Sequence, residues 1–164
     1  MAAKATIQNV QDKGFQSVMF GAPATFSSAG GLIDFQLSAA SNWAAQKVGA
    51  ANYAAQSTGY IFDCLVKAEI AYASRELWLA RIAFIDGNAS MNLDAGNRSQ
   101  MLSQARALAD AADADALRWI GEAMRILGQD VESIVFGTGL ASGIVETGMF
   151  PQTISIARNY GGAQ

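Results

Sequence analysis

Histidine is absent from this chain, and cysteine, proline and charged residues are scarce. Without histidine the chain lacks the commonest general base, the usual catalytic triads and the usual zinc ligand. The single cysteine, Cys64, cannot form a disulfide within the chain and leaves no cysteine-based metal site. These absences argue against an enzyme, and we expect no catalytic residue, no cofactor and no bound metal.

Charged residues make up only 15% of the 164 residues, against about 25% in an average soluble domain. A surface this poor in charge is expected to be covered by copies of the same chain, by a partner protein or by lipid. The net charge of −3 argues against a broad basic surface, so sequence-specific nucleic-acid binding is not expected. The sequence also predicts no signal peptide and no uninterrupted apolar run of about 18 residues that would span a membrane.

The region richest in small residues is 30–59 (GGLIDFQLSAASNWAAQKVGAANYAAQSTG). Alanine and glycine recur there at four-residue intervals, which places them on shared faces of a helix. Such faces let a second helix approach closely. We therefore predict an assembly interface formed by Trp43, Ala45, Gly49, Ala50, Ala51, Ala54, Ala55 and Gly59. Polar residues also run along this segment, namely Gln36, Asn42, Gln46, Asn52 and Gln56. They would form an inter-helix hydrogen-bond ladder, the polar face of a channel or a plain solvent face.

Strong helix formers and apolar residues continue with few breaks over 31–85, which predicts one long helix that Gly59 bends without ending. Asp86-Gly87-Asn88 is a turn signal, and a second amphipathic helix is expected over 98–127, ending at Gly128. The fold class is therefore all-α, with the two helices in an antiparallel hairpin. The expected organisation is a docking arm (1–27), a helical domain (28–128), and a Gly-rich apolar segment with a tail (129–164).

The expected arm is interrupted by glycine and proline but carries the aromatic residues Phe15, Phe20 and Phe26. We expect these rings to dock on a neighbouring molecule. Trp43, which lies among alanines, is expected to anchor a contact between chains or at a lipid boundary.

Carboxylates are the remaining candidates for chemistry. Asp110 and Asp113 share a helix face, where either a divalent cation or solvent would meet them, and we favour solvent. Glu69 and Glu76 lie two turns apart on the long helix, but the Glu-x-x-His partner of di-iron bundles is missing, so we reject a di-iron site.

Residues 30–56 resemble the N-terminal part of the internal virion and DNA-ejection proteins of short-tailed phages, where a Gly-rich apolar stretch leads into a helix rich in Ala, Gln and Asn. That resemblance implies a place inside the head or at its portal, and release to help form a conduit across the host envelope. The stretch from Gly21-Ala22-Pro23-Ala24 to Asn42 and Gln46 is also similar to the R-body proteins, which polymerise into contractile ribbons. Both families are non-enzymatic and assemble through Ala-rich helices.

The sequence thus predicts a self-assembling structural protein, a phage virion component made in the bacterial cytoplasm. Its expected partners are copies of itself and other virion proteins. The alternatives are an R-body-like polymer and a membrane-active conduit, in which 30–55 and 137–145 would insert into the host membrane after release. A third alternative is a small soluble binding module or enzyme, for which replacement of Asp110 and Asp113 would change metal binding or activity.

Overall fold

Helices are the only regular secondary structure in the residues that the computed structural model describes, 1–87 and 95–129. In chain order they are α1 (Ile7–Gln11), the 3-10 helix η1 (Ser17–Phe20), α2 (Leu32–Val48), α3 (Ala50–Ala55), α4 (Tyr60–Gly87) and α5 (Ala95–Ile126). The prediction of an all-α fold is confirmed. The expected segment 129–164 falls outside the described residues except for Gln129, and so does the expected insertion segment 137–145.

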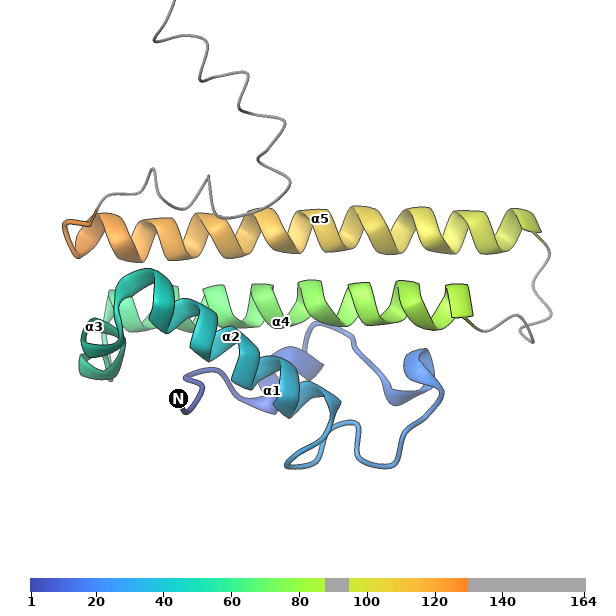
Figure 1. The fold of residues 1–164 in the computed structure, drawn as a ribbon, viewed down its shortest axis with the longest axis horizontal. Helices are drawn as coiled ribbons and strands as arrows, with labels where there is room; N and C mark the ends of the chain where they lie inside the picture. Colours follow the sequence, from blue (N-terminus) through green and yellow to red (C-terminus); the bar gives the residue numbers. More distant parts are fainter. Residues whose placement is uncertain (88–94, 130–164) are drawn as a thin grey trace, which may run out of the picture. The chain divides into compact units, whose positions relative to one another are not determined.

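The two longest helices, α4 and α5, form the predicted antiparallel hairpin (Figure 1). Near one end, Arg98 at the start of α5 reaches Asp86 at the end of α4, with 3.1 Å between Nη2 and Oδ1. Towards the other end, the Lys67 ammonium of α4 lies 4.2 Å from the centre of the Trp119 ring of α5. Contacts between early residues of one helix and late residues of the other establish the antiparallel direction.

The predicted continuous helix over 31–85 is wrong, because the chain leaves the helical conformation twice. Gly49 separates α2 from α3 with φ 84° and ψ 136°. Residues 56–59 separate α3 from α4, and Gly59 has φ 87°. A positive φ is open to glycine and strained for residues with a side chain, so the helix breaks at these two glycines despite the strong helix formers around them.

One cluster of the core lies between α2 and α4 and is completed by the N-terminal residues. It contains Val10, Phe15 and Phe26 from the first 27 residues, Ile33, Leu37 and Ala40 from α2, and Ala73 and Leu77 from α4. Buried residues of α5, Ile120 and Met124 among them, belong to the rest of the core. The buried positions of α2 recur every three or four residues, which is the spacing of one helix face. Residues 1–129 form one compact unit, so the predicted arm packs as part of the helical domain.

None of the helices described in residues 1–87 and 95–129 is both long enough and apolar enough to cross a bilayer.

Candidate assembly surface

The small residues of the predicted interface divide into exposed and buried positions. Gly49, Ala50, Ala51, Ala54 and Ala55 are exposed and are named here the α3 patch. They lie on or beside a six-residue helix, and within it only Ala50 with Ala54 and Ala51 with Ala55 retain the four-residue helical spacing. The α3 patch is therefore a small, compact surface that directly follows the C-terminal end of α2.

Two other predicted interface residues flank this patch differently. Ala45 is buried, so its methyl group packs within the chain. Gly59 is exposed, but it is the last residue of the break at 56–59 and directly precedes α4. The predicted stripes from Ala45 to Gly49 and from Ala55 to Gly59 do not run along single helices, because a break falls within each.

An open hollow of about 400 Å³ adjoins the α3 patch and is named here the α2–α3 hollow. It is lined by Met1, Asn42, Ala45, Gln46, Gly49 and Ala50. The Asn42 side chain accepts a hydrogen bond from the Met1 terminal ammonium at 3.0 Å, and Asn52 Nδ2 donates to the Val48 carbonyl at 2.9 Å. These two amides of the predicted polar ladder are thus already paired within the chain.

Trp43 stacks on Tyr72 of α4, with ring centres 4.7 Å apart and planes at 25°. The indole is half-buried, and one of its faces is occupied within the chain. This contact attaches α2 to α4. One face of Trp43 is therefore used within the chain, and the expected contact with a neighbouring chain or a lipid boundary stays a prediction for the rest of the indole.

The aromatic residues of the predicted arm pack on the chain itself. Phe15 lies 5.0 Å from Trp78 of α4, and Phe20 stacks on Phe26 at 5.2 Å between ring centres. Phe15 and Phe26 are buried, whereas Phe20 is partly exposed. The prediction that these rings dock on a neighbour is wrong for Phe15 and Phe26, because the apolar side of α4 receives them.

A buried carboxylate, Glu69 of α4, holds the N-terminal residues and α3 in place. Its Oε2 accepts hydrogen bonds from the backbone N–H groups of Lys4 and Ala5, each at 2.8 Å. Its Oε1 accepts a hydrogen bond from the Tyr53 hydroxyl of α3. Sequence reasoning considered Glu69 only for a di-iron pair with Glu76, and Glu76 instead pairs with Arg75.

The Lys4 side chain also contacts the region around α3. Its ammonium donates to the Gln56 carbonyl in the break between α3 and α4. It also lies 4.4 Å from the centre of the Tyr53 ring and 5.4 Å from that of Phe62. The conformation of the α3 patch is thus fixed by buried and partly buried groups beneath it.

Burial raises the pKa of Glu69, and the hydrogen bonds from Tyr53, Ala5 and Lys4 oppose that shift without cancelling it. Burial, followed by the hydrogen bond to Glu69, raises the pKa of Tyr53. The Tyr53 oxygen also lies 3.2 Å from the Ala2 carbonyl. When Glu69 takes up a proton it can donate to the Tyr53 oxygen, while the hydroxyl proton of Tyr53 turns to Ala2.

This arrangement predicts an unusual dependence of stability on pH. The pKa of Glu69 is raised in the folded state, so its contribution to the free energy of unfolding is fully present below the unfolded value, near 4.5. That contribution is lost as pH rises through the folded pKa. Urea titrations should be compared at pH values from about 4.5 upward, through the raised pKa of Glu69 in the folded state. Over this interval the free energy of unfolding of the wild type should fall relative to that of Glu69→Gln as pH increases. A wild type that gains on Glu69→Gln with rising pH would contradict the raised pKa.

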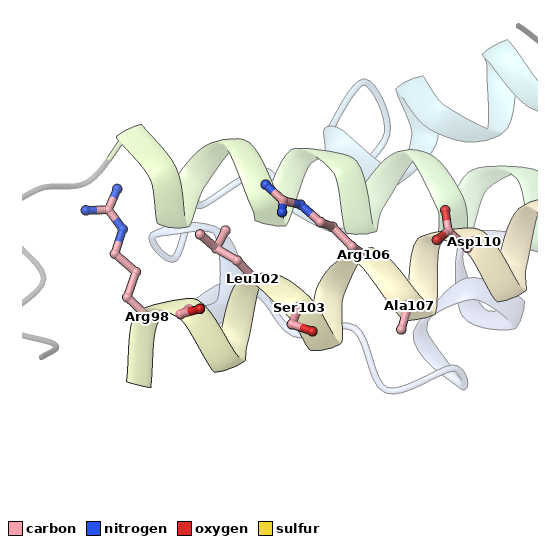
Figure 2. Close-up of a pocket in the computed structure, with 7 residues that line it drawn as sticks. Arg98, Leu102, Ser103, Arg106, Ala107 and Asp110 are labelled. Atoms are coloured by element: carbon pink, nitrogen blue, oxygen red, sulfur yellow. The ribbon is translucent and has the colours of Figure 1, made fainter. Parts of the chain in front are cut away.

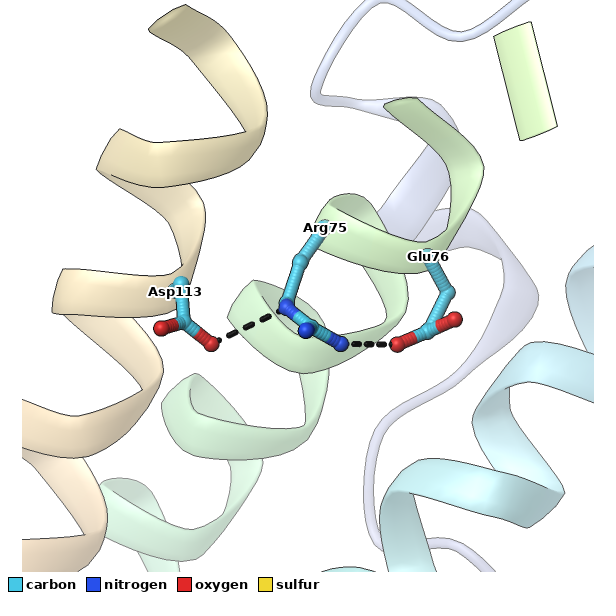
Figure 3. Close-up of polar contacts among 3 residues, drawn as sticks. All are labelled: Arg75, Glu76 and Asp113. Carbon is cyan, nitrogen blue, oxygen red and sulfur yellow. Dashed lines mark hydrogen bonds and ion pairs between the residues drawn. The ribbon is translucent and has the colours of Figure 1, made fainter. Parts of the chain in front are cut away.

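The acidic residues of α5 are used structurally or face solvent. Asp113 pairs with Arg75 of α4 at 3.0 Å, and the same guanidinium contacts Glu76 (Figure 3). Asp110 and Asp115 are exposed. The described part of the chain holds no group of three or more potential ligands that could bind a metal ion. Because the Arg75–Asp113 pair is partly exposed, it contributes at most about 1 kcal/mol to stability.

A second hollow, of about 650 Å³, runs along α5 (Figure 2). Its described lining residues are Arg98, Ser99, Leu102, Ser103, Arg106, Ala107 and Asp110. All of them lie on one helix, and Arg98 is already bonded to Asp86. Polar groups spread along a single helix do not converge on one point, so this surface does not have the geometry of a ligand site.

The α3 patch and its adjoining hollow are therefore the strongest candidate for a functional surface in the described residues. Comparisons of the chain with protein-family models, with curated proteins and with solved structures found no match.

Proposed function

We propose that this chain is a non-enzymatic structural protein that assembles with copies of itself through the α3 patch. The observation that carries the proposal is the exposure of five small, uncharged residues, Gly49, Ala50, Ala51, Ala54 and Ala55, on a buried support. Small side chains allow the backbone of a partner to come close, and a fixed support means that little ordering is needed on contact.

The finer proposal is a phage virion component, internal or associated with the portal or tail. It rests on the resemblance of residues 30–56 to the DNA-ejection proteins of short-tailed phages. The α3 patch falls within that segment. Other virion proteins are then further partners of the same surface.

Size-exclusion chromatography with light scattering, at tens of micromolar protein, tests the assembly. The wild type is expected to form a defined oligomer or a polymer. The double variant Ala51→Glu/Ala54→Glu should shift it to smaller species, because two carboxylates would have to be buried in the contact. The matched control is Ala107→Glu/Ala111→Glu, at exposed positions of α5, which should leave the size unchanged. A wild type that is strictly monomeric under these conditions would overturn the proposal.

A further inference from the structure

The outer face of α2 carries a strip of residues that runs from the exposed ring of Phe35 to the α2–α3 hollow. Phe35, Ala39, Asn42 and Gln46 recur at intervals of three and four residues, opposite the buried positions of the same helix. Phe35 has 67% of its surface exposed, a fraction that only Val18 equals among the large apolar residues described. The strip ends at Gly49, which lines the hollow.

The ring and the hollow are placed symmetrically about the middle of the strip. Gly49 lies fourteen positions after Phe35, which is about 21 Å at the rise of an α-helix. Asn42 lies midway between them. If two copies lie antiparallel about a two-fold axis at Asn42, each Phe35 ring meets the hollow of the other copy. One symmetry operation then makes both contacts.

We propose that two copies of this chain pair antiparallel through the outer faces of α2, with Phe35 of each copy seated in the α2–α3 hollow of the other. The inference rests on the proposed self-assembly and specifies one contact within it. The hollow is lined by Ala45, Gly49 and Ala50, which leave room for an aromatic ring. It is continuous with the α3 patch, since Gly49 and Ala50 belong to both.

The charges of α2 favour the antiparallel direction. Asp34 lies in the first turn and Lys47 in the last turn. Neither makes an ion pair with another described residue, and Asp34 accepts only the Gly30 N–H, at 2.7 Å. An antiparallel pair brings the Asp34 end of one copy to the Lys47 end of the other and also opposes the helix dipoles. A parallel pair would instead bring like charges to the same end.

Phe35→Ser tests the contact by light scattering over a dilution series. We expect the dissociation constant of the pair to rise about tenfold or more, because a buried aromatic anchor is lost. Val18→Ser is the matched control, since Val18 is equally exposed and lies outside the strip. Both substitutions are on the surface, and far-UV circular dichroism verifies that each variant is folded.

Cysteine cross-linking tests the direction and register of the pair. Asn42→Cys should form a disulfide-linked dimer on mild oxidation, because each Asn42 faces its own copy at the axis. Phe35→Cys should not cross-link alone, but should do so when mixed with Ala50→Cys. If the wild type assembles but Phe35→Ser has no effect and Asn42→Cys does not cross-link, this contact is overturned while the proposed function stands. A monomeric wild type overturns both.

Discussion

Replacing Gly31 with alanine is expected to lower the free energy of unfolding by about 2–4 kcal/mol. A Cβ at this buried position would lie 1.5 Å from the Thr25 carbonyl oxygen and 2.9 Å from that of Ser28. Both are backbone atoms, so no side-chain rotation relieves the overlap. The φ of Gly31 is −82°, which any residue adopts, so the requirement is for space alone.

The overlap can be relieved only if residues 25–28 move away from the start of α2. Phe26 lies in this segment with its ring in the core, and its carbonyl accepts the Ile33 N–H at 3.2 Å. Moving the segment therefore disturbs core packing and the first turn of α2 together. This coupling places the expected effect well above that of an ordinary surface substitution.

Urea denaturation followed by tryptophan fluorescence measures the effect, and Gly30→Ala is the matched control. Gly30 has φ 73° with no atom within 4 Å of an added Cβ, so alanine there meets backbone strain but no overlap. We expect that variant to lose about 1 kcal/mol. If the two variants lost the same free energy of unfolding, the overlap at Gly31 would not be the reason that glycine is needed there.

The hairpin of α4 and α5 could be predicted from the sequence because its determinants are local. Apolar residues recur at helical spacing on both sides of the turn signal at Asp86-Gly87. Apart from Glu69, no charged residue described in α4 or α5 is buried. The breaks at Gly49 and Gly59 could not be predicted in the same way. A glycine inside a helix is unfavourable by about 1 kcal/mol, which neighbouring helix formers can overcome. The contacts that hold the segment between the two breaks come from outside it, from Lys4 to Gln56 and from Glu69 to Tyr53.

The candidate surface was predictable only in part for the same reason. Spacing identified Ala50, Ala51, Ala54 and Ala55, which are exposed, because small residues at helical intervals are a local pattern. Whether an aromatic ring remains exposed depends on whether residues far away in the sequence pack against it in the fold. Phe15 and Trp43 meet Trp78 and Tyr72 of α4, and no feature of the flanking residues announces these pairs.

Glu69 shows the limit of sequence reasoning most clearly. It lies between Ala68 and Ile70 in an apolar stretch, which only hints at burial. Its partners are the backbone of Lys4 and Ala5 and the hydroxyl of Tyr53, at sequence separations from 16 to 65 residues. Backbone donors leave no signature in the sequence at all.

Replacing Glu69 with alanine is expected to lower the free energy of unfolding by about 3–5 kcal/mol at neutral pH. The substitution leaves the two backbone N–H groups of Lys4 and Ala5 without the acceptor that they share, removes one hydrogen-bond partner of the Tyr53 hydroxyl, and opens a cavity beside α4. Each unsatisfied buried donor is unfavourable by about 1–3 kcal/mol. Urea titration measures the loss, and limited proteolysis should show faster cleavage within the first residues of the chain.

Glu69→Gln separates the hydrogen bonds from the charge and should lose less than about 1 kcal/mol. Its amide oxygen can accept both backbone N–H groups, and its amide nitrogen can donate to the Tyr53 oxygen while that hydroxyl turns to the Ala2 carbonyl, 3.2 Å away. Because Tyr53 also holds α3, the proposed assembly should weaken in the alanine variant and persist in the glutamine variant. Similar losses of stability in both variants would mean that the negative charge, rather than the hydrogen-bond geometry, is what the fold requires.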